Sequence, residues 1–269
     1  MQSFTPSLSK FALTVSLLGA VVLAGHVSSA NAQAVPNEVV PAVVPASQAA
    51  IDAFLASHPN TSVSIRGGNI TRVYGRTFAA GTSPIGTADA FVSANAAMFG
   101  VTPANLPPIG PFPDGARVVP LVYDSVTDSY KFNLVTYSQF LNGLPVFRAD
   151  LRVLVRNEAG FPAVQVSSSL KDLGAFATNF KGGPISPSSI DQGKLMRSVR
   201  SHFQAAPKLS ALEAVIWAGV DEQPETPRLA YKFVAQGGSP VQPDSYQKVL
   251  YVVDAATGRV LFNEDQICN

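Results

Sequence analysis

An approximate internal repeat is the strongest constraint on how this chain can fold. Tyr130-Lys-Phe132 is matched by Tyr231-Lys-Phe233, and residues 153–160 are matched by residues 251–258. The distance from tyrosine to glycine is 30 residues in the first copy and 27 in the second. In both copies a run of strand-forming residues enters a short turn closed by glycine, which adopts a left-handed conformation at little cost. The repeat predicts two related β-rich units, and chance similarity between ordinary hairpins is the alternative.

The segment 140–155 lies at the centre of the first copy. Asn142-Gly143 provides the positive φ angles of a tight turn. Pro145 fixes φ and lacks an N–H group, which suits the start of a strand and makes this strand a candidate edge. Polar and apolar residues then alternate with the period of a strand that buries one face, and the apolar set is Ala149, Leu151, Val153 and Val155.

The other segments repeat the order of one helix followed by four strands. We expect Thr87 to cap the first of these helices, with Asp89 in its first turn and Gly100 after its end. Leu195 and Val199 mark the second helix. The expected strands are residues 118–123, 130–137, 140–155 and a strand ending near 169, then 213–218, 229–235, 249–253 and 259–262. A short helix near 48–58 and a hairpin over 62–74 precede them. The predicted fold class is α+β, with two related units, each an antiparallel sheet with a helix packed on one face.

The first 34 residues have the organisation of a signal peptide. Lys10 supplies the positive charge, residues 11–25 are apolar, and Ala30-Asn-Ala32 and Ala32-Gln-Ala34 are both cleavage-site patterns. The apolar run is short for a membrane span. We therefore expect an exported protein, secreted, periplasmic or at the cell surface, without stable membrane insertion. A Pro-rich linker over residues 35–47 follows.

Charge and cysteine content narrow the possible partners. The 19 Lys and Arg residues face 18 Asp and Glu residues, and removal of Lys10 with the signal peptide leaves 18 of each. This balance gives no electrostatic basis for binding nucleic acid. Cys268 is the single cysteine, so an internal disulfide is impossible. It is an incidental tail residue, an intermolecular link or a reactive thiol. Asn60 and Asn69 begin glycosylation sequons, which matter only in a eukaryotic host.

None of the polar residues forms a recognisable catalytic, cofactor or metal motif. His26 leaves with the signal peptide, and His58 and His202 have no Glu or Cys at zinc-ligand spacing. The segment 81–85 approaches a nucleophile elbow but lacks the final glycine. We interpret Asp150 as an outward-facing strand residue and Asp254 as the residue that shapes the turn before Gly258. We therefore expect no catalytic, cofactor-binding or metal-binding residues and no enzymatic activity.

Three groups of motifs are similar to the pro-regions of secreted zinc metallopeptidases. Ile65-Arg-Gly67, Val73-Tyr-Gly75 and Met98-Phe-Gly-Val101 resemble the FTP domain, the fungalysin/thermolysin propeptide module. The sequence from Tyr137 to Leu151 is similar to the pattern that follows the FTP domain in these pro-regions, and the matching residues include Gln139, Gly143, Pro145 and Asp150. Residues 229–231 and 252–261 look like the PepSY domain. The resemblance covers roughly residues 50–265 and implies an FTP-type domain over 48–180 and a PepSY-like domain over 181–269.

In that family the pro-region is an intramolecular chaperone and inhibitor of the peptidase. The zinc ligands belong to a catalytic domain downstream, and this sequence ends at Asn269 without one. The resemblance therefore implies a non-catalytic protein that binds a thermolysin- or fungalysin-type metallopeptidase in trans, as folding chaperone, inhibitor or both. Two alternatives stay open: the pro-region of a precursor truncated at residue 269, and a secreted or surface binding module for an unrelated ligand. The sequence does not indicate an oligomeric state.

Overall fold

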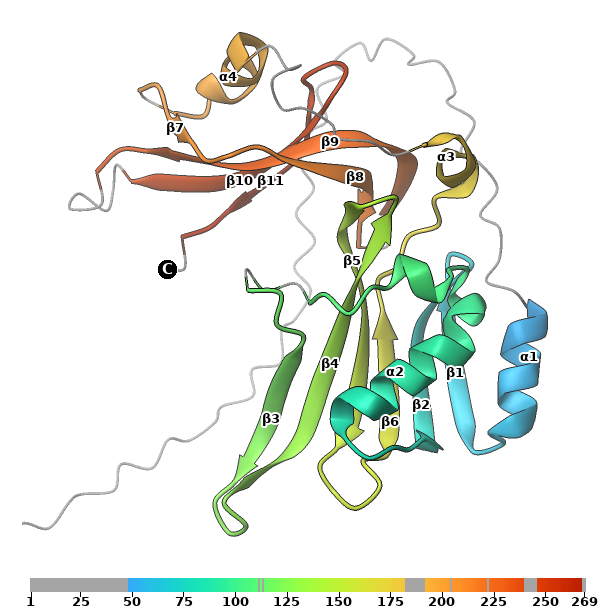
Figure 1. The fold of residues 1–269 in the computed structure, drawn as a ribbon. Helices are drawn as coiled ribbons and strands as arrows, with labels where there is room; N and C mark the ends of the chain where they lie inside the picture. The colour runs from blue at the N-terminus through green and yellow to red at the C-terminus, as the bar shows by residue number, and fades with distance from the viewer. Residues whose placement is uncertain are drawn as a thin grey trace, which may run out of the picture. The chain divides into compact units, whose positions relative to one another are not determined.

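Strands dominate the molecule. The computed structural model describes residues 48–110, 112, 114–181, 192–203, 205–221, 223–239 and 246–267, which all belong to one compact unit. The expected signal peptide, the linker over 35–47, the interdomain segment around 182–187 and Cys268 lie outside the described residues. The described chain is a mixture of helices with a connected sheet of 11 strands (Figure 1). The expectation of a mixed, sheet-dominated fold is therefore confirmed.

The first part of the sheet is an antiparallel meander with a hairpin added to it. Strands β3 (Val118–Asp124), β4 (Ser129–Leu141), β5 (Leu144–Arg156) and β6 (Ala163–Ser168) pair in chain order. Strand β6 also pairs with β2 (Asn69–Ala79), whose other neighbour is β1 (Thr61–Arg66). Helix α2 (Pro84–Asn95) covers one face of these strands, and α1 (Gln48–Ser57) lies beside β1 (Figure 1). Their buried residues Phe54 and Phe91 pack with Val73, Leu151 and Val153 in one core.

The second part has the same succession of strands. Strands β8 (Glu213–Val220), β9 (Gln223–Gly237), β10 (Gln247–Asp254) and β11 (Val260–Asp265) pair in order and are antiparallel. Helix α4 (Gln192–Arg200) packs Leu195 and Val199 against Tyr231, Phe233 and Tyr251. The short strand β7 (Lys208–Leu209) pairs with β9, and a parallel bridge between Val146 of β5 and Ile216 of β8 joins the two meanders.

Three short elements complete the fold: the 3-10 helices Ala96–Phe99 and Pro103–Asn105, and helix α3 (Gly174–Asn179). Gly100 ends the first of them in a left-handed conformation with φ of 72°, as the sequence predicts. The second lies at the start of residues 103–115, a segment rich in proline and glycine. Strand β7 and helix α3 are too short to leave a periodic pattern in the sequence, and neither was expected.

The predicted start of helix α2 is wrong. Ser83 is the N-cap: its side chain accepts a hydrogen bond from the Gly86 N–H group, and Pro84 takes the first helical position. Thr87 is completely buried inside the helix, and its hydroxyl donates to the Phe161 carbonyl oxygen at 2.8 Å. Asp89 therefore lies beyond the first turn. The missed signal is the Ser-Pro pair, because proline needs no N–H partner at that position.

The hairpin between β4 and β5 is confirmed, but β5 is not an edge strand. Asn142 and Gly143 have φ of 50° and 86°, as a tight turn requires. Strand β5 pairs with β4, β6 and β8. Pro145 is tolerated because it lies next to the turn, opposite Phe140. Among the described strands the edges of the sheet are elsewhere, and β3 pairs only with β4.

Candidate functional site

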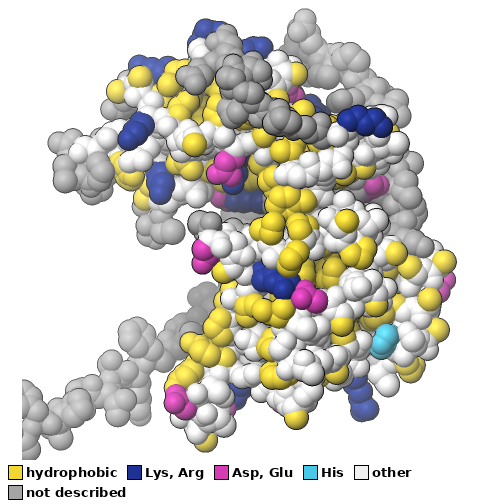
Figure 2. Space-filling view, in the orientation of Figure 1, with side chains coloured by type: hydrophobic (Ala, Val, Ile, Leu, Met, Phe, Trp, Pro, Cys, Tyr) yellow, Lys and Arg dark blue, Asp and Glu magenta, His cyan; other side chains and the backbone are white. Residues whose placement is uncertain are grey.

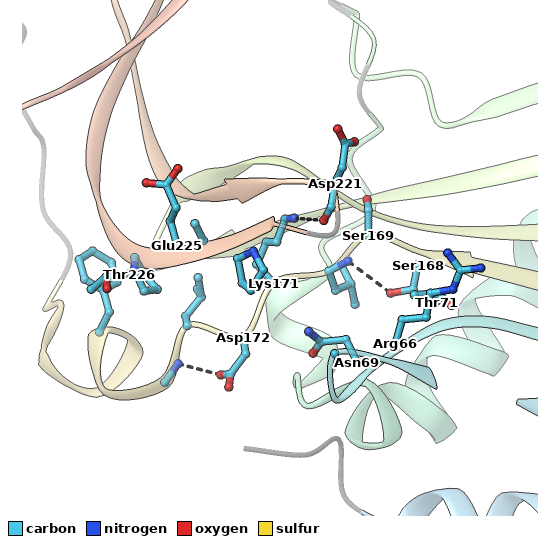
Figure 3. Close-up of a pocket in the computed structure, with 18 of the residues that line it drawn as sticks. Arg66, Asn69, Thr71, Ser168, Ser169, Lys171, Asp172, Asp221, Glu225 and Thr226 are labelled. Carbon is cyan, nitrogen blue, oxygen red and sulfur yellow. Dashed lines mark hydrogen bonds between the residues drawn. The ribbon is translucent and has the colours of Figure 1, made fainter. Parts of the chain in front are cut away.

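A cavity of about 300 Å³ lies where segments distant in the sequence meet. It is lined by residues of the β1–β2 hairpin, of the segment that runs from β6 into α3, and of β8 and β9 (Figure 3). Much of its wall is apolar: Ile70, Leu170, Leu173, Phe176, Ala218, Pro224 and Pro227. This volume is at the small end of the range of about 300–1,000 Å³ that is typical of ligand pockets.

Gln139 of β4 fixes one wall of the cavity. Its side chain is 2% exposed, and its amide group donates to the Lys171 carbonyl oxygen and accepts from the Lys171 N–H group, both at 2.8 Å. The side chain therefore replaces a strand partner for a segment that has left the sheet. Since buried backbone groups must be hydrogen-bonded, this pair determines where Lys171 lies.

Lys171 contributes a buried cation to the cavity. The residue is 8% exposed, and its Nζ donates to the main-chain oxygen of Asp221 at 3.0 Å (Figure 3). Among the described residues that oxygen is its one hydrogen-bond acceptor. Burial lowers the pKa of the ammonium group, although the charge of Asp221 acts in the opposite direction. A protonated lysine has three donors, so the site leaves capacity for an acceptor from a ligand.

Three acidic residues line the cavity, Asp172, Asp221 and Glu225, and the hydrogen bond from Lys171 goes to the main chain of Asp221 rather than to a carboxylate. Asp172 accepts a hydrogen bond from the Gly174 N–H group at 2.8 Å and so shapes the entry into α3. Figure 3 shows the side chains of Asp221 and Glu225 extending away from the Lys171 ammonium group. No ion pair joins Lys171 to a described acidic residue.

A second polar cluster joins α2 to the sheet. The Arg117 guanidinium group contacts both carboxylate oxygens of Asp89, at 2.7 and 3.1 Å, and lies 5.3 Å from the centre of the Tyr137 ring. The Tyr137 hydroxyl donates to Asp89 at 2.5 Å. The hydrogen bonds from Arg117 lower the pKa of Asp89, while burial and the neighbouring Asp89 raise the pKa of Tyr137. With every charge paired, the cluster holds the helix on the sheet.

The β3–β4 hairpin has apolar and aromatic side chains in contact with solvent. They are Val122, Tyr123, Val126 and Tyr130, and Val126 at the turn is 91% exposed. The rings of Tyr123 and Tyr130 meet edge to face, with centroids 5.4 Å apart. Hydrophobic side chains gather over this hairpin at the lower left of Figure 2. Because β3 pairs only with β4 among the described strands, exposed apolar groups and an edge of the sheet coincide here.

The two aspartates singled out from the sequence lie far apart in the chain and have different surroundings. Asp150 lies on the face of β5 opposite to Leu151, but its side chain is only 13% exposed because Arg152 pairs with it at 2.7 Å. It therefore faces outward from the strand as expected, with its carboxylate covered by Arg152. Asp254 accepts hydrogen bonds from the Ala256 and Thr257 N–H groups, at 2.9 and 2.7 Å, and so shapes the turn as expected.

The remaining candidates do not meet in one place. His58 bonds to the Phe54 carbonyl oxygen and stacks on the Phe54 ring at the end of α1. His202 bonds to the Tyr251 hydroxyl at 2.8 Å. Part of the segment 81–85 forms the first turn of α2. Asn60 is exposed, whereas Asn69 is partly buried and lines the cavity.

Reasoning from the sequence missed Lys171. Its segment is a loop with no periodic pattern, and its partners Gln139 and Asp221 are 32 and 50 residues away. One weak signal was present in the sequence. Gln139 lies on the same face of β4 as Tyr137, and the other residues of that face at this end of the strand are buried and apolar. A polar side chain at such a position predicts a specific hydrogen-bond partner.

The described residues contain neither a cluster of metal ligands nor a membrane-spanning helix. No group of three or more His, Cys, Asp or Glu side chains among them is arranged to hold a metal ion. In the same part of the chain, none of the helices combines the length and apolar character needed to span a membrane.

Comparisons with known proteins do not place the chain in a family. No family model matches it, and no curated protein matches it. Among solved structures it is similar to the Bacillus megaterium YpeB C-terminal domain, with 12% identity, a TM-score of 0.31, and coverage of 82% of this chain and 96% of that chain. A TM-score this low supports no argument. The resemblance to FTP and PepSY domains therefore rests on the residues quoted above.

Proposed function

We propose that this protein is an exported, non-catalytic binding protein that attaches to a secreted thermolysin- or fungalysin-type zinc metallopeptidase, as folding chaperone, inhibitor or both. The observation that carries the proposal is the coincidence of a sheet edge with exposed apolar side chains on the β3–β4 hairpin. An exposed edge can accept a strand from a partner, and pockets or side chains beside it then give selectivity. A partner bound in its native form is stabilised by mass action.

The roles of the residues that resemble the pro-region pattern support a scaffold. Tyr137 anchors α2 through Asp89, Gln139 holds the loop at Lys171, and Gly143 forms the tight turn before β5. Each of these three residues helps to hold the fold. We infer from this that the motif preserves the shape of a binding protein, with partner contacts made by the exposed hairpin.

We also infer that the chain contains two related units, an FTP-type domain over 48–180 and a PepSY-like domain over 181–269. The support is the strand order of the two meanders, each covered by a helix. Their third strands also share an irregularity: the pairing shifts between Leu154 and Val155 in one and between Val252 and Val253 in the other. These positions correspond in the sequence repeat.

The test compares two matched charge substitutions. Val126→Asp places a carboxylate at the tip of the hairpin, and Ile85→Asp places one on another exposed side chain, in the first turn of α2, where the helix dipole favours an acidic residue. The wild-type protein should slow peptide hydrolysis by such a peptidase or raise its refolding yield. Val126→Asp should weaken this effect by about tenfold or more, because an unpaired buried carboxylate is costly, and Ile85→Asp should leave it unchanged.

Several peptidases should be tried, including any encoded by the same organism. If none responds to the wild-type protein, the proposal fails. If the wild-type protein binds a peptidase but both variants act like the wild type, the proposal of a peptidase partner is kept and the hairpin is rejected as the binding surface. Recovery of one unrelated partner and no peptidase in pull-downs favours the general binding module.

A further inference from the structure

The cavity beside Lys171 combines two features that ordinary packing defects lack. Its wall carries apolar side chains, among them Ile70, Leu173 and Phe176, which face a space of about 300 Å³. It also contains the ammonium group of Lys171, which is 8% exposed and has one described acceptor. Polar and charged residues also line the cavity, among them Arg66, Asp172 and Glu225. Lys171 differs from them because it is a buried cation with hydrogen-bond donors to spare.

The position of the cation is set by the fold. Gln139 holds the main chain of Lys171 from β4, and the Asp221 carbonyl oxygen holds its Nζ from the end of β8. Both contacts are long-range, and the side chain cannot turn to solvent without losing its hydrogen bond to Asp221. A fixed, buried ammonium group with unused donors is a preorganised site for an anionic oxygen.

We propose that this cavity binds a small carboxylate with an apolar body, whose carboxylate accepts hydrogen bonds from Lys171 and whose body packs on Ile70, Leu173 and Phe176. The volume limits the ligand to a short aliphatic or aromatic acid, or to the last residue of a peptide with a free C-terminal carboxylate. Both sources present the same chemistry to the site. The inference does not depend on peptidase binding, because the β3–β4 hairpin contributes no residue to the cavity.

The ligand is expected to carry a negative charge, because such a charge would stabilise the protonated form of Lys171. Burial disfavours the protonated form of Lys171, as its lowered pKa indicates. A bound carboxylate would restore that form by pairing with it. A neutral amide of the same shape can accept a hydrogen bond but brings no charge, so it should bind more weakly.

Calorimetric titration of the purified protein with 3-phenylpropionate and hexanoate, and with their amides, tests the site directly. The acids should bind at least about tenfold more tightly than the amides, because charge-assisted hydrogen bonds are roughly twice as strong as neutral ones. Acetyl-Leu-Phe with a free carboxylate, compared with its C-terminal amide, separates a peptide source from a free acid. Absence of binding by every acid, or equal binding of acids and amides, overturns the proposal.

Variants locate the ligand. Lys171→Met keeps the length of the side chain and removes the charge, and it should weaken acid binding by at least about tenfold. Lys248→Met removes an exposed charge from β10 and should leave binding unchanged. Ala175→Phe, at an exposed position of α3 on the cavity wall, should block acids and amides alike. If Lys171→Met does not fold, Ala175→Phe and the comparison of acids with amides on the wild-type protein test the proposal instead. Full binding of the acids by Ala175→Phe would contradict the assigned location of the site.

Discussion

The two meanders agree where β5 and β10 enter their turns and disagree in the strands that come before. Gly160 and Gly258 both have positive φ, 81° and 73°, and the same irregular pairing precedes each of them. In the preceding strand, however, Phe233 lies opposite Tyr251, whereas the matching Phe132 lies opposite Arg156. The counterpart of Tyr251 in the repeat is Val153, which lies opposite Val135. The register of the two hairpins therefore differs by three residues, the difference between spacings of 30 and 27.

An odd shift reverses the face of every side chain in a strand. This explains why the matched tyrosines have opposite environments: Tyr130 is 42% exposed on β4, and Tyr231 is 1% exposed in the core under α4. Similarity of short motifs thus identified the turn correctly and the preceding strand incorrectly. The expected equivalence of Tyr130-Lys-Phe132 and Tyr231-Lys-Phe233 is wrong in structural terms. Because of this shift, Tyr130 is exposed on the β3–β4 hairpin, the surface that we propose for the partner.

Replacing each matched tyrosine with alanine should give the largest contrast. Tyr231→Ala should lower the free energy of unfolding by about 3–5 kcal/mol, as loss of a large buried aromatic side chain does. Tyr130→Ala should cost about 1 kcal/mol or less, because it loses only an exposed cross-strand contact with Tyr123. Urea unfolding followed by the fluorescence of Trp217, the single tryptophan and a buried one, measures both. Equal losses would contradict the difference in register.

The matched turns differ at the residue that begins them, which is Arg156 in the first meander and Asp254 in the second. Asp254→Ala should cost about 2–3 kcal/mol at pH 7, because it removes hydrogen bonds from the main chain to a charged acceptor. Burial raises the pKa of Asp254, but the hydrogen bonds from Thr257 and Ala256 outweigh it and leave the pKa below its usual value of 3.8. Since the folded pKa is lowered, the stabilisation is complete above pH 3.8 and decreases as the pH falls through the folded value.

The unfolding free energy of wild type and Asp254→Ala should therefore converge in acid. Arg156→Ala serves as the control, because its guanidinium group is half exposed and, among the described residues, forms an ion pair only with the exposed Glu158, at 3.6 Å. This variant should change stability by about 0.5 kcal/mol or less. A gap between wild type and Asp254→Ala that stays constant from pH 7 to pH 3 would show that the ionised carboxylate does not hold the turn.

How much of the structure was predictable depends on the range of the interactions. The alternation in Ala149, Leu151, Val153 and Val155 and the Asn142-Gly143 turn are local, and both are confirmed. Whether a strand lies at the edge or in the centre of a sheet is not a local property. Pro145 indicated an edge strand, but β5 pairs with the parallel strand β8, which begins 68 residues further on. The alternation of polar and apolar residues within a strand does not indicate which distant strand it pairs with.

The candidate cavity was unpredictable for the same reason. Its walls come from residues as far apart as Arg66 and Pro227, and no two of its segments share a motif. The exposed hairpin was partly predictable, since the strands and the turn around residue 126 follow from composition. That β3 has one described neighbour, however, depends on the pairing of the whole sheet.

The glycines that close the matched turns should respond alike, and this comparison probes the shared part of the two meanders with the smallest expected effect. Gly160→Ala and Gly258→Ala should each lower stability by about 1–2 kcal/mol, because alanine is strained at positive φ. Gly258→Ala should lie toward the upper end, since its new methyl group would meet the Lys194 side chain at 3.2 Å, while no atom lies within 4 Å of the corresponding site at Gly160. Asparagine, which tolerates this conformation better, should recover part of the loss at both positions when measured by urea unfolding. A loss at one turn with none at the other would mean that the common glycine does not reflect a common turn, and it would remove the best structural support for two related units.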